Sequence, residues 1–131
     1  MGYYTRFNIE VQDIDKKGYD AYKIVKYMLD KQNESDAFYP FRHQLEDFIK
    51  DTDSELGTSY RLYLDDNDEY KWYECDDEMI ALSKEFPEVL FKVHGEGEES
   101  GDIWDRYFMN GKTQYCPAEV MCPPFDRTKL S

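Results

Sequence analysis

The chain has 131 residues and a formal net charge of −13, from 16 basic and 29 acidic side chains. Hydrophobic residues make up 40% of it, which is too many for a disordered chain. No stretch approaches the roughly 20 apolar residues of a membrane span. Because phosphate backbones and anionic membranes are bound by positive surfaces, the charge argues against both as direct ligands. It favours partners with basic surfaces instead.

The length predicts a single domain over residues 1–131. Three cysteines, Cys75, Cys116 and Cys122, are an odd and sparse set, which is typical of a reducing compartment. The first residues run directly into a strand pattern, so we expect no secretion signal. A cytoplasmic location follows as a prediction.

The first half of the chain predicts a strand, two helices and a hairpin. Apolar and polar residues alternate over 5–11, as in a half-buried strand. Residues 21–29 carry the apolar stripe of an amphipathic helix, and a second, short helix is expected after Pro40. Alternation returns over 60–64 and 70–73, and the polar run 65–68 between them is typical of a turn.

The second half predicts a helix followed by three strands. Asp76 or Asp77 is expected to cap the helix, and Pro87 to end it. A strand over 89–94 runs into His94-Gly95-Glu96-Gly97, where two close glycines predict a bulge or a tight bend. Strands over 103–109 and 112–115 are joined by Asn110-Gly111, the sequence that a type I′ turn favours.

These elements predict an α+β fold. A mainly antiparallel sheet would carry its helices on one face, close to the ferredoxin-like plan but with an inserted short helix and extra hairpins. The proline-containing tail, 116–131, is expected to be irregular and to lie over the sheet through its apolar residues Val120, Met121 and Phe125.

Acidic residues gather at 65–69, 74–78 and 96–102. The first run is not an EF-hand loop, because Tyr70 stands where the invariant glycine would be. The second lies at the start of the predicted helix, where the helix dipole favours negative charge, and this explains it. In the third, two interpretations remain open: a divalent-cation or acid/base site, or a solvated hairpin whose charges guard a sheet edge. The residues concerned are His94, Glu96, Glu98, Glu99 and Asp102.

No phosphate-binding loop, dinucleotide-binding glycine pattern or zinc motif is present, so we predict no cofactor and no enzymatic activity. Several aromatic residues fall on the opposite side of their strands from the clearest core positions. They could stack bases, anchor a protein partner, or be covered by the tail and the extra helix. These residues are Tyr3, Tyr4, Tyr63, Tyr73, Trp104 and Phe108.

Three stretches carry a resemblance: the opening Gly2-Tyr3-Tyr4-Thr5, the segment Lys71-Trp72-Tyr73, and the HGEGEESGDIW and YFMNGK motifs after Phe86-Pro87. Together they resemble small acidic accessory proteins encoded by bacteriophages and prophages. The likeness covers the first strand and most of the second half, but not residues 33–66. It implies a small protein of the host bacterial cytoplasm that binds and disables a host or defence protein.

The sequence therefore predicts a non-enzymatic inhibitor of the anti-CRISPR or anti-restriction type, which occupies a basic nucleic-acid channel as a nucleic-acid mimic or blocks an effector surface. The alternatives are a nucleotide-signal sponge or other small-molecule binder, and a metal-dependent hydrolase. The predicted partner-binding residues are Glu96, Glu98, Glu99, Asp102 and Trp104, with Asp65, Asp66 and Asp68 as a second patch.

Overall fold

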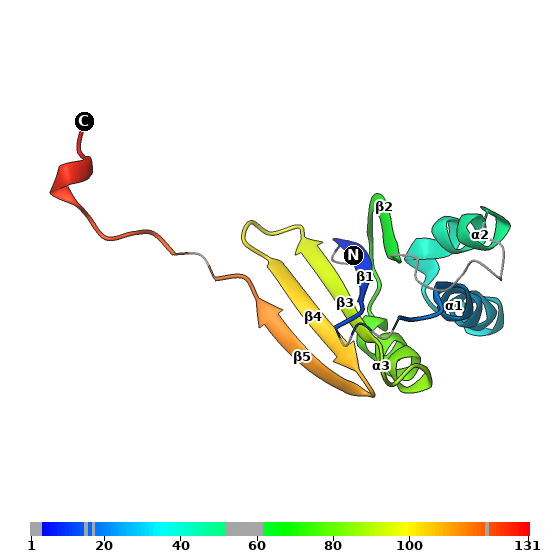
Figure 1. Cartoon of the computed structure of the whole chain (residues 1–131). Coiled ribbons are helices and arrows are strands. Elements are labelled where there is room, and N and C mark those ends of the chain that lie inside the picture. The colour runs from blue at the N-terminus through cyan, green and yellow to red at the C-terminus, as the bar shows by residue number, and fades with distance from the viewer. Residues whose placement is uncertain (1–3, 15, 17, 52–61, 120) are drawn as a thin grey trace.

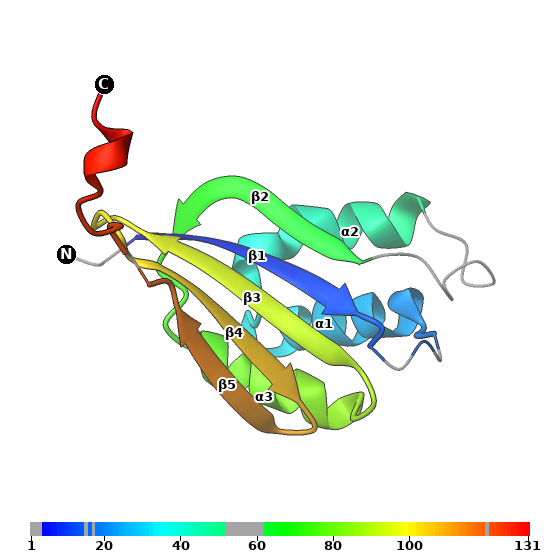
Figure 2. The same cartoon turned by 60° about the vertical axis from the view of Figure 1, so that its left-hand side comes forward.

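The computed structural model describes residues 4–14, 16, 18–51, 62–119 and 121–131, without the side chains of Asp51, Asp66 and Asn67. Within these residues the chain forms a five-stranded antiparallel sheet in the order β2-β1-β3-β4-β5. The helices lie behind one face of this sheet, and the other face is left open (Figure 2). The predicted α+β class with a mainly antiparallel sheet is confirmed.

The core lies between the sheet and the helices. In β1 (Thr5–Gln12), the odd-numbered residues are buried and the even-numbered ones are only half-buried. Central strand β3 (Leu90–Gly97) has the same alternation, with Phe91 and Val93 fully buried. The buried side chains of the helices and strands form one cluster, as expected when an apolar sheet face meets apolar helix stripes.

Helix α1 (Ala21–Ser35) begins at Asp20, whose side chain accepts a hydrogen bond from the Lys23 backbone N–H. It packs on α2 (Arg42–Asp51), which follows the 3₁₀ turn Tyr39–Phe41. Figure 1 shows these two helices on one side of β2 (Tyr63–Tyr70). After β1, a single helix would bring the chain back so that the next strand runs parallel to β1. Here the second helix, α2, reverses the chain direction once more, so β2 pairs antiparallel with β1.

This direct pairing of β1 with β2 departs from the ferredoxin-like plan, in which another strand separates the first two. The predicted hairpin around residues 65–68 is also wrong, because those residues lie within β2. A register irregularity opposite Phe7 accommodates them. Among the described residues β2 pairs with β1 alone, as an edge strand does, and charged residues on such a strand oppose pairing with another chain. Tyr60 and Arg61 lie outside the described residues.

The expected bend at the two glycines is wrong too. β3 continues through Gly95 and Gly97, and its pairing with β1 runs without interruption from Gln12–Leu90 to Thr5–Gly97. Gly95 is needed for another reason: a Cβ atom there would overlap the indole ring of Trp104 on β4 (Ile103–Met109). The glycine makes room for an aromatic ring rather than for a change of direction.

The hairpin between β4 and β5 (Lys112–Pro117) is confirmed, and Asn110 and Gly111 both have positive φ, as a type I′ turn requires. Helix α3 (Cys75–Glu85) is confirmed as well, but its predicted cap is wrong. The N-cap position is Glu74, and Asp76 lies inside the first turn, where its carboxylate accepts a hydrogen bond from Arg106 at 2.6 Å.

The tail does not lie over the sheet. After Pro117 the chain leads away from the body, and its last 3₁₀ turn, Arg127–Lys129, stands apart from every other element (Figure 1). Met121 and Phe125 are exposed, and Val120 is outside the described residues.

Gln32 is a polar residue in the apolar stripe of α1. It is 5% exposed, and neither its Nε2 nor its Oε1 has a hydrogen-bond partner in the described structure. Because an unsatisfied buried amide costs more than an apolar group of similar shape, we expect Gln32→Met to raise the free energy of unfolding by about 1 kcal/mol. Urea denaturation of both proteins measures this. A variant less stable than the parent would show that the amide has a partner.

Candidate functional site

The open face of the sheet is polar, whereas the face covered by the helices is apolar. Its centre is built from alternate residues of three neighbouring strands, because side chains alternate between the two faces of a strand. These residues are half-buried: Arg6, Asn8 and Glu10 of β1, Lys92, His94 and Glu96 of β3, and Asp105 and Tyr107 of β4. A charged surface of this kind is the candidate site.

Arg6 joins two acidic runs that are far apart in the sequence. Its guanidinium contacts the Asp65 carboxylate at 3.2 Å and the Glu96 carboxylate at 3.8 Å. In the pairing register, Glu69 of β2 and Glu96 of β3 lie directly opposite Arg6 on its two sides. The structure therefore places Asp65 of the second predicted patch beside Glu96 of the first.

The loop that follows β3 extends this charge past the end of the sheet. Glu98 and Glu99 are exposed there, and the Glu98 carboxylate accepts a hydrogen bond from the Tyr4 backbone N–H at 2.9 Å. The Gly97 N–H donates to the Asp102 carbonyl at 2.8 Å, and the Asp102 N–H donates to the Glu99 carbonyl at 3.1 Å. The carboxylates are thus held on a closed loop that is tied to the start of β1.

We call this region the acidic end. It consists of Asp65, Glu69, Glu96, Glu98 and Glu99 around Arg6, with Asp102 at the foot of the loop. Asp68 is exposed on β2 nearby and accepts a hydrogen bond from the Glu69 N–H. The side chain of Asp66 is outside the described structure. Arg6 itself was missed in the sequence, although the alternation along β1 places it on the open face.

Trp104 does not share this surface. It pairs with Gly95, whereas Glu96 pairs with Ile103, so Trp104 and Glu96 lie on opposite faces of the sheet. The Trp104 ring packs edge-on against Phe7 at 6.1 Å between centroids, and the Arg106 guanidinium lies 4.8 Å from it. Phe108, another member of the predicted aromatic set, is fully buried. These two residues support the core rather than an aromatic platform.

His94 lies at the centre of the open face. Its Nδ1 is 2.7 Å from the Asp105 carboxylate, which can only accept a hydrogen bond, so the ring donates from Nδ1. Its Nε2 is 3.8 Å from Glu96. Lys92 contacts the same Asp105 at 3.8 Å. Arg6, Lys92 and His94 therefore each lie beside a carboxylate on this face.

The arrangement lacks the geometry of a nucleophilic triad. In the pairing register, Asp105 stands between His94 and Cys116, which puts the histidine and the thiol two strands, or roughly 10 Å, apart. In a triad the histidine occupies the middle position. Burial raises the pKa of the Cys75 thiol far above its ordinary range, so this cysteine is a core residue.

The predicted cation ligands point to different partners. His94 faces Asp105 and Glu96, while Glu98 binds the backbone at Tyr4. Within the described ranges, no group of three or more His, Cys, Asp or Glu side chains is arranged to hold a metal ion. The helices in the same ranges are all too short or too polar to cross a lipid bilayer.

Comparison of the chain with models of protein families, with curated proteins and with solved structures found no match.

Proposed function

We propose that the protein is a non-enzymatic inhibitor whose acidic end docks onto a basic surface of a nucleic-acid-handling protein, such as a CRISPR or restriction effector. The observation that carries the proposal is the position of Arg6, which gathers the carboxylates of two distant sequence runs into one region. The resemblance to phage accessory proteins sets the context in which such an inhibitor would act.

The physical basis is electrostatic complementarity. A protein surface that binds nucleic acid presents Lys and Arg to a dense row of phosphates. The acidic end presents carboxylates from two strands and a closed loop, on a sheet whose pairing holds their spacing. The net charge of −13 adds a long-range field that increases the rate of encounter with a positive surface. A carboxylate surface of this kind competes with nucleic acid for the same Lys and Arg side chains of the partner.

The first test is affinity purification of the full chain from a nuclease-treated bacterial lysate, followed by mass spectrometry. We expect a DNA- or RNA-handling protein that is released by raised salt, because screening shortens the Debye length to about 3 Å at 1 M. Duplex DNA should displace the inhibitor from the recovered protein. Recovery of no such protein, or simultaneous binding of DNA and inhibitor, would contradict the proposal.

We expect the double variant Glu98→Lys, Glu99→Lys to bind the recovered protein at least about tenfold more weakly, because like charges brought together across an interface cost several kcal/mol and about 1.4 kcal/mol is a factor of ten. Both side chains are exposed, and the Tyr4 N–H that loses its Glu98 acceptor lies at an exposed residue where water can replace the carboxylate, so melting should change little. Isothermal titration and thermal denaturation measure the two effects.

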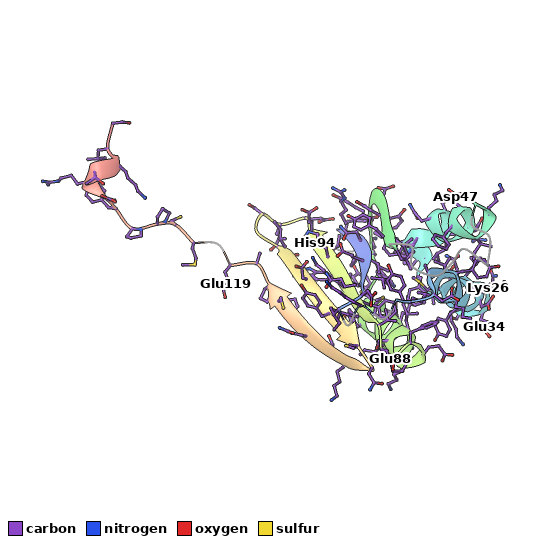
Figure 3. All side chains as sticks on the ribbon, in the orientation of Figure 1. Lys26, Glu34, Asp47, Glu88, His94 and Glu119 are labelled. Carbon is purple, nitrogen blue, oxygen red and sulfur yellow. The ribbon has the colours of Figure 1, made fainter. Side chains whose placement is uncertain are left out.

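The matched control is Asp47→Lys, Glu88→Lys, which changes the net charge by the same amount. Asp47 lies on α2 and Glu88 near the start of β3, both away from the β3–β4 loop (Figure 3). We expect this variant to retain most of the affinity. Equal weakening by both variants would mean that overall charge, rather than the acidic end, controls binding.

A further inference from the structure

The tail is the one part of the described chain that leaves several large apolar side chains in solvent together. Met121 is 82% exposed, Phe125 76% and Leu130 68%. Pro123 and Pro124 stiffen the segment, and Asp126 orders the turn after them by accepting hydrogen bonds from the Thr128 N–H and Oγ. A locally ordered segment with uncovered apolar residues has the character of a docking peptide.

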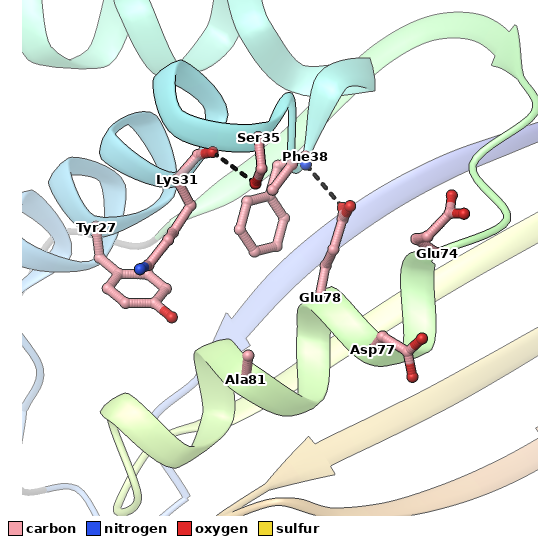
Figure 4. A pocket seen from close by; sticks show the side chains of 9 residues that line it. Tyr27, Lys31, Ser35, Phe38, Glu74, Asp77, Glu78 and Ala81 are labelled. Atoms are coloured by element: carbon pink, nitrogen blue, oxygen red, sulfur yellow. Dashed lines mark hydrogen bonds between the residues drawn. The ribbon is translucent and has the colours of Figure 1, made fainter.

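A groove of suitable character lies between α1 and α3 (Figure 4). It encloses about 320 Å³, which is within the range of ligand pockets. Ala81 is exposed on one side of it and Tyr27 is half-exposed on the other, while the buried Ala37 and Phe38 lie at its floor. The groove stays open because α1 packs on α2, whereas α3 packs on the sheet strands β3, β4 and β5.

The floor of this groove is held by an unusual backbone. Phe38 has φ of 58°, a left-handed conformation that a bulky residue rarely adopts. Its N–H donates to the Glu78 carboxylate of α3 at 2.8 Å, which fixes the phenyl ring between the two helices (Figure 4). The structure therefore maintains the groove at a cost in backbone strain.

Charge and spacing match the tail to this groove. On the α3 wall, Asp77 lies four residues before Ala81, about 6 Å along the helix, and Glu74 lies about 4.5 Å further. In the tail, Arg127 lies two residues after Phe125, about 7 Å in an extended chain. Lys129 lies about 4 Å beyond it, because residues 127–129 form a 3₁₀ turn.

We propose that the tail of one copy docks in the groove of a second copy, and that two reciprocal contacts close a dimer. Phe125 packs over Ala81 and Phe38, Arg127 pairs with Asp77, and Lys129 pairs with Glu74. On the opposite wall, Lys31 is 3.2 Å from Glu34, which offsets its charge. The tail points away from its own body in both views (Figures 1 and 2). It can therefore enter the groove of a second molecule without the stiff proline segment folding back on itself. This dimer is independent of the acidic end.

Sedimentation equilibrium of the full chain tests the proposal. We expect a concentration-dependent dimer that weakens at least tenfold in a tail variant, Phe125→Ala with Leu130→Ala, and in a groove variant, Ala81→Arg. All substituted residues are exposed, so folding should persist, and circular dichroism checks this. Ile14→Ala removes an exposed apolar side chain elsewhere and should leave the dimer unchanged.

Mixing the two variants makes the test specific. The groove variant keeps an intact tail and the tail variant keeps an intact groove, so an equimolar mixture restores one contact and associates more strongly than either variant alone. A parent protein that is monomeric at all concentrations overturns the proposal. So does a dimer that both variants leave unchanged, or a mixture that associates no better than its components.

Discussion

Replacement of Gly95 by alanine is expected to lower the free energy of unfolding by about 2–3 kcal/mol, within the range for overpacked cores. The added Cβ would overlap the Trp104 ring, which also packs against Phe7. Neither neighbour can move easily, because Gly95 pairs with Phe7 on one side and with Trp104 on the other. Denaturant unfolding, with the transition midpoint and slope recorded for each protein, measures the loss.

A double-mutant cycle separates this overlap from the general effect of alanine in a strand. In a Trp104→Leu background, where the large ring is absent, Gly95→Ala should cost less than about 1 kcal/mol. An equal cost in both backgrounds would show that the ring is not the reason for the glycine.

Replacement of Glu78 by alanine is expected to cost about 3 kcal/mol, because two buried donors would lose their acceptor. One Glu78 oxygen accepts hydrogen bonds from the Trp72 indole Nε1–H at 2.6 Å and from the Phe38 N–H at 2.8 Å. Trp72 is 3% exposed and Phe38 1%, so water does not readily replace the carboxylate. The Trp72 ring in turn contacts Phe7 and Phe41, which connects α3 to the aromatic core.

The control is Glu85→Ala, seven residues later on the same helix. Glu85 is exposed, and its removal should change the free energy of unfolding by no more than about 0.5 kcal/mol. If both alanine variants are equally destabilised, helix charge rather than the two hydrogen bonds is responsible.

Glu78 also predicts a dependence of stability on pH. Burial raises the pKa of this carboxyl above its ordinary value of 4.5, although the two N–H donors act in the opposite direction. The folded state then binds the proton more tightly than the unfolded state. The stability that Glu78 contributes through this proton is fully present below pH 4.5 and is lost as the pH rises through the raised pKa of the folded state.

Glu78→Gln isolates this contribution, because glutamine keeps the accepting oxygen but does not titrate in this range. We expect the parent to gain stability relative to the Gln variant as the pH falls from 7 towards 4.5. Urea unfolding of both proteins across this interval measures the difference. A difference that stays constant, or that changes in the opposite direction, would contradict the raised pKa.

Local patterns were sufficient for much of this fold. The stripe of α1, the alternation of β1 and the Asn110-Gly111 turn each depend on a few consecutive residues, and each was predicted from the sequence. The predicted turn at 65–68 was wrong, because its outcome depended on a neighbouring strand. The run 65–68 has the composition of a turn, but Arg6 pairs with Asp65 and the run lies in an edge strand.

By itself, the sequence determined the strong negative charge, the α+β class and the positions of most helices and strands, because periodicity and turn chemistry act over short stretches. Only the tertiary structure decided which charges meet. The pairing register brought Arg6 between Glu69 and Glu96, and placed Trp104 over Gly95 on the other face. The physical reason is that register and face are set by strands distant in sequence, and a shift of one residue would exchange the two faces.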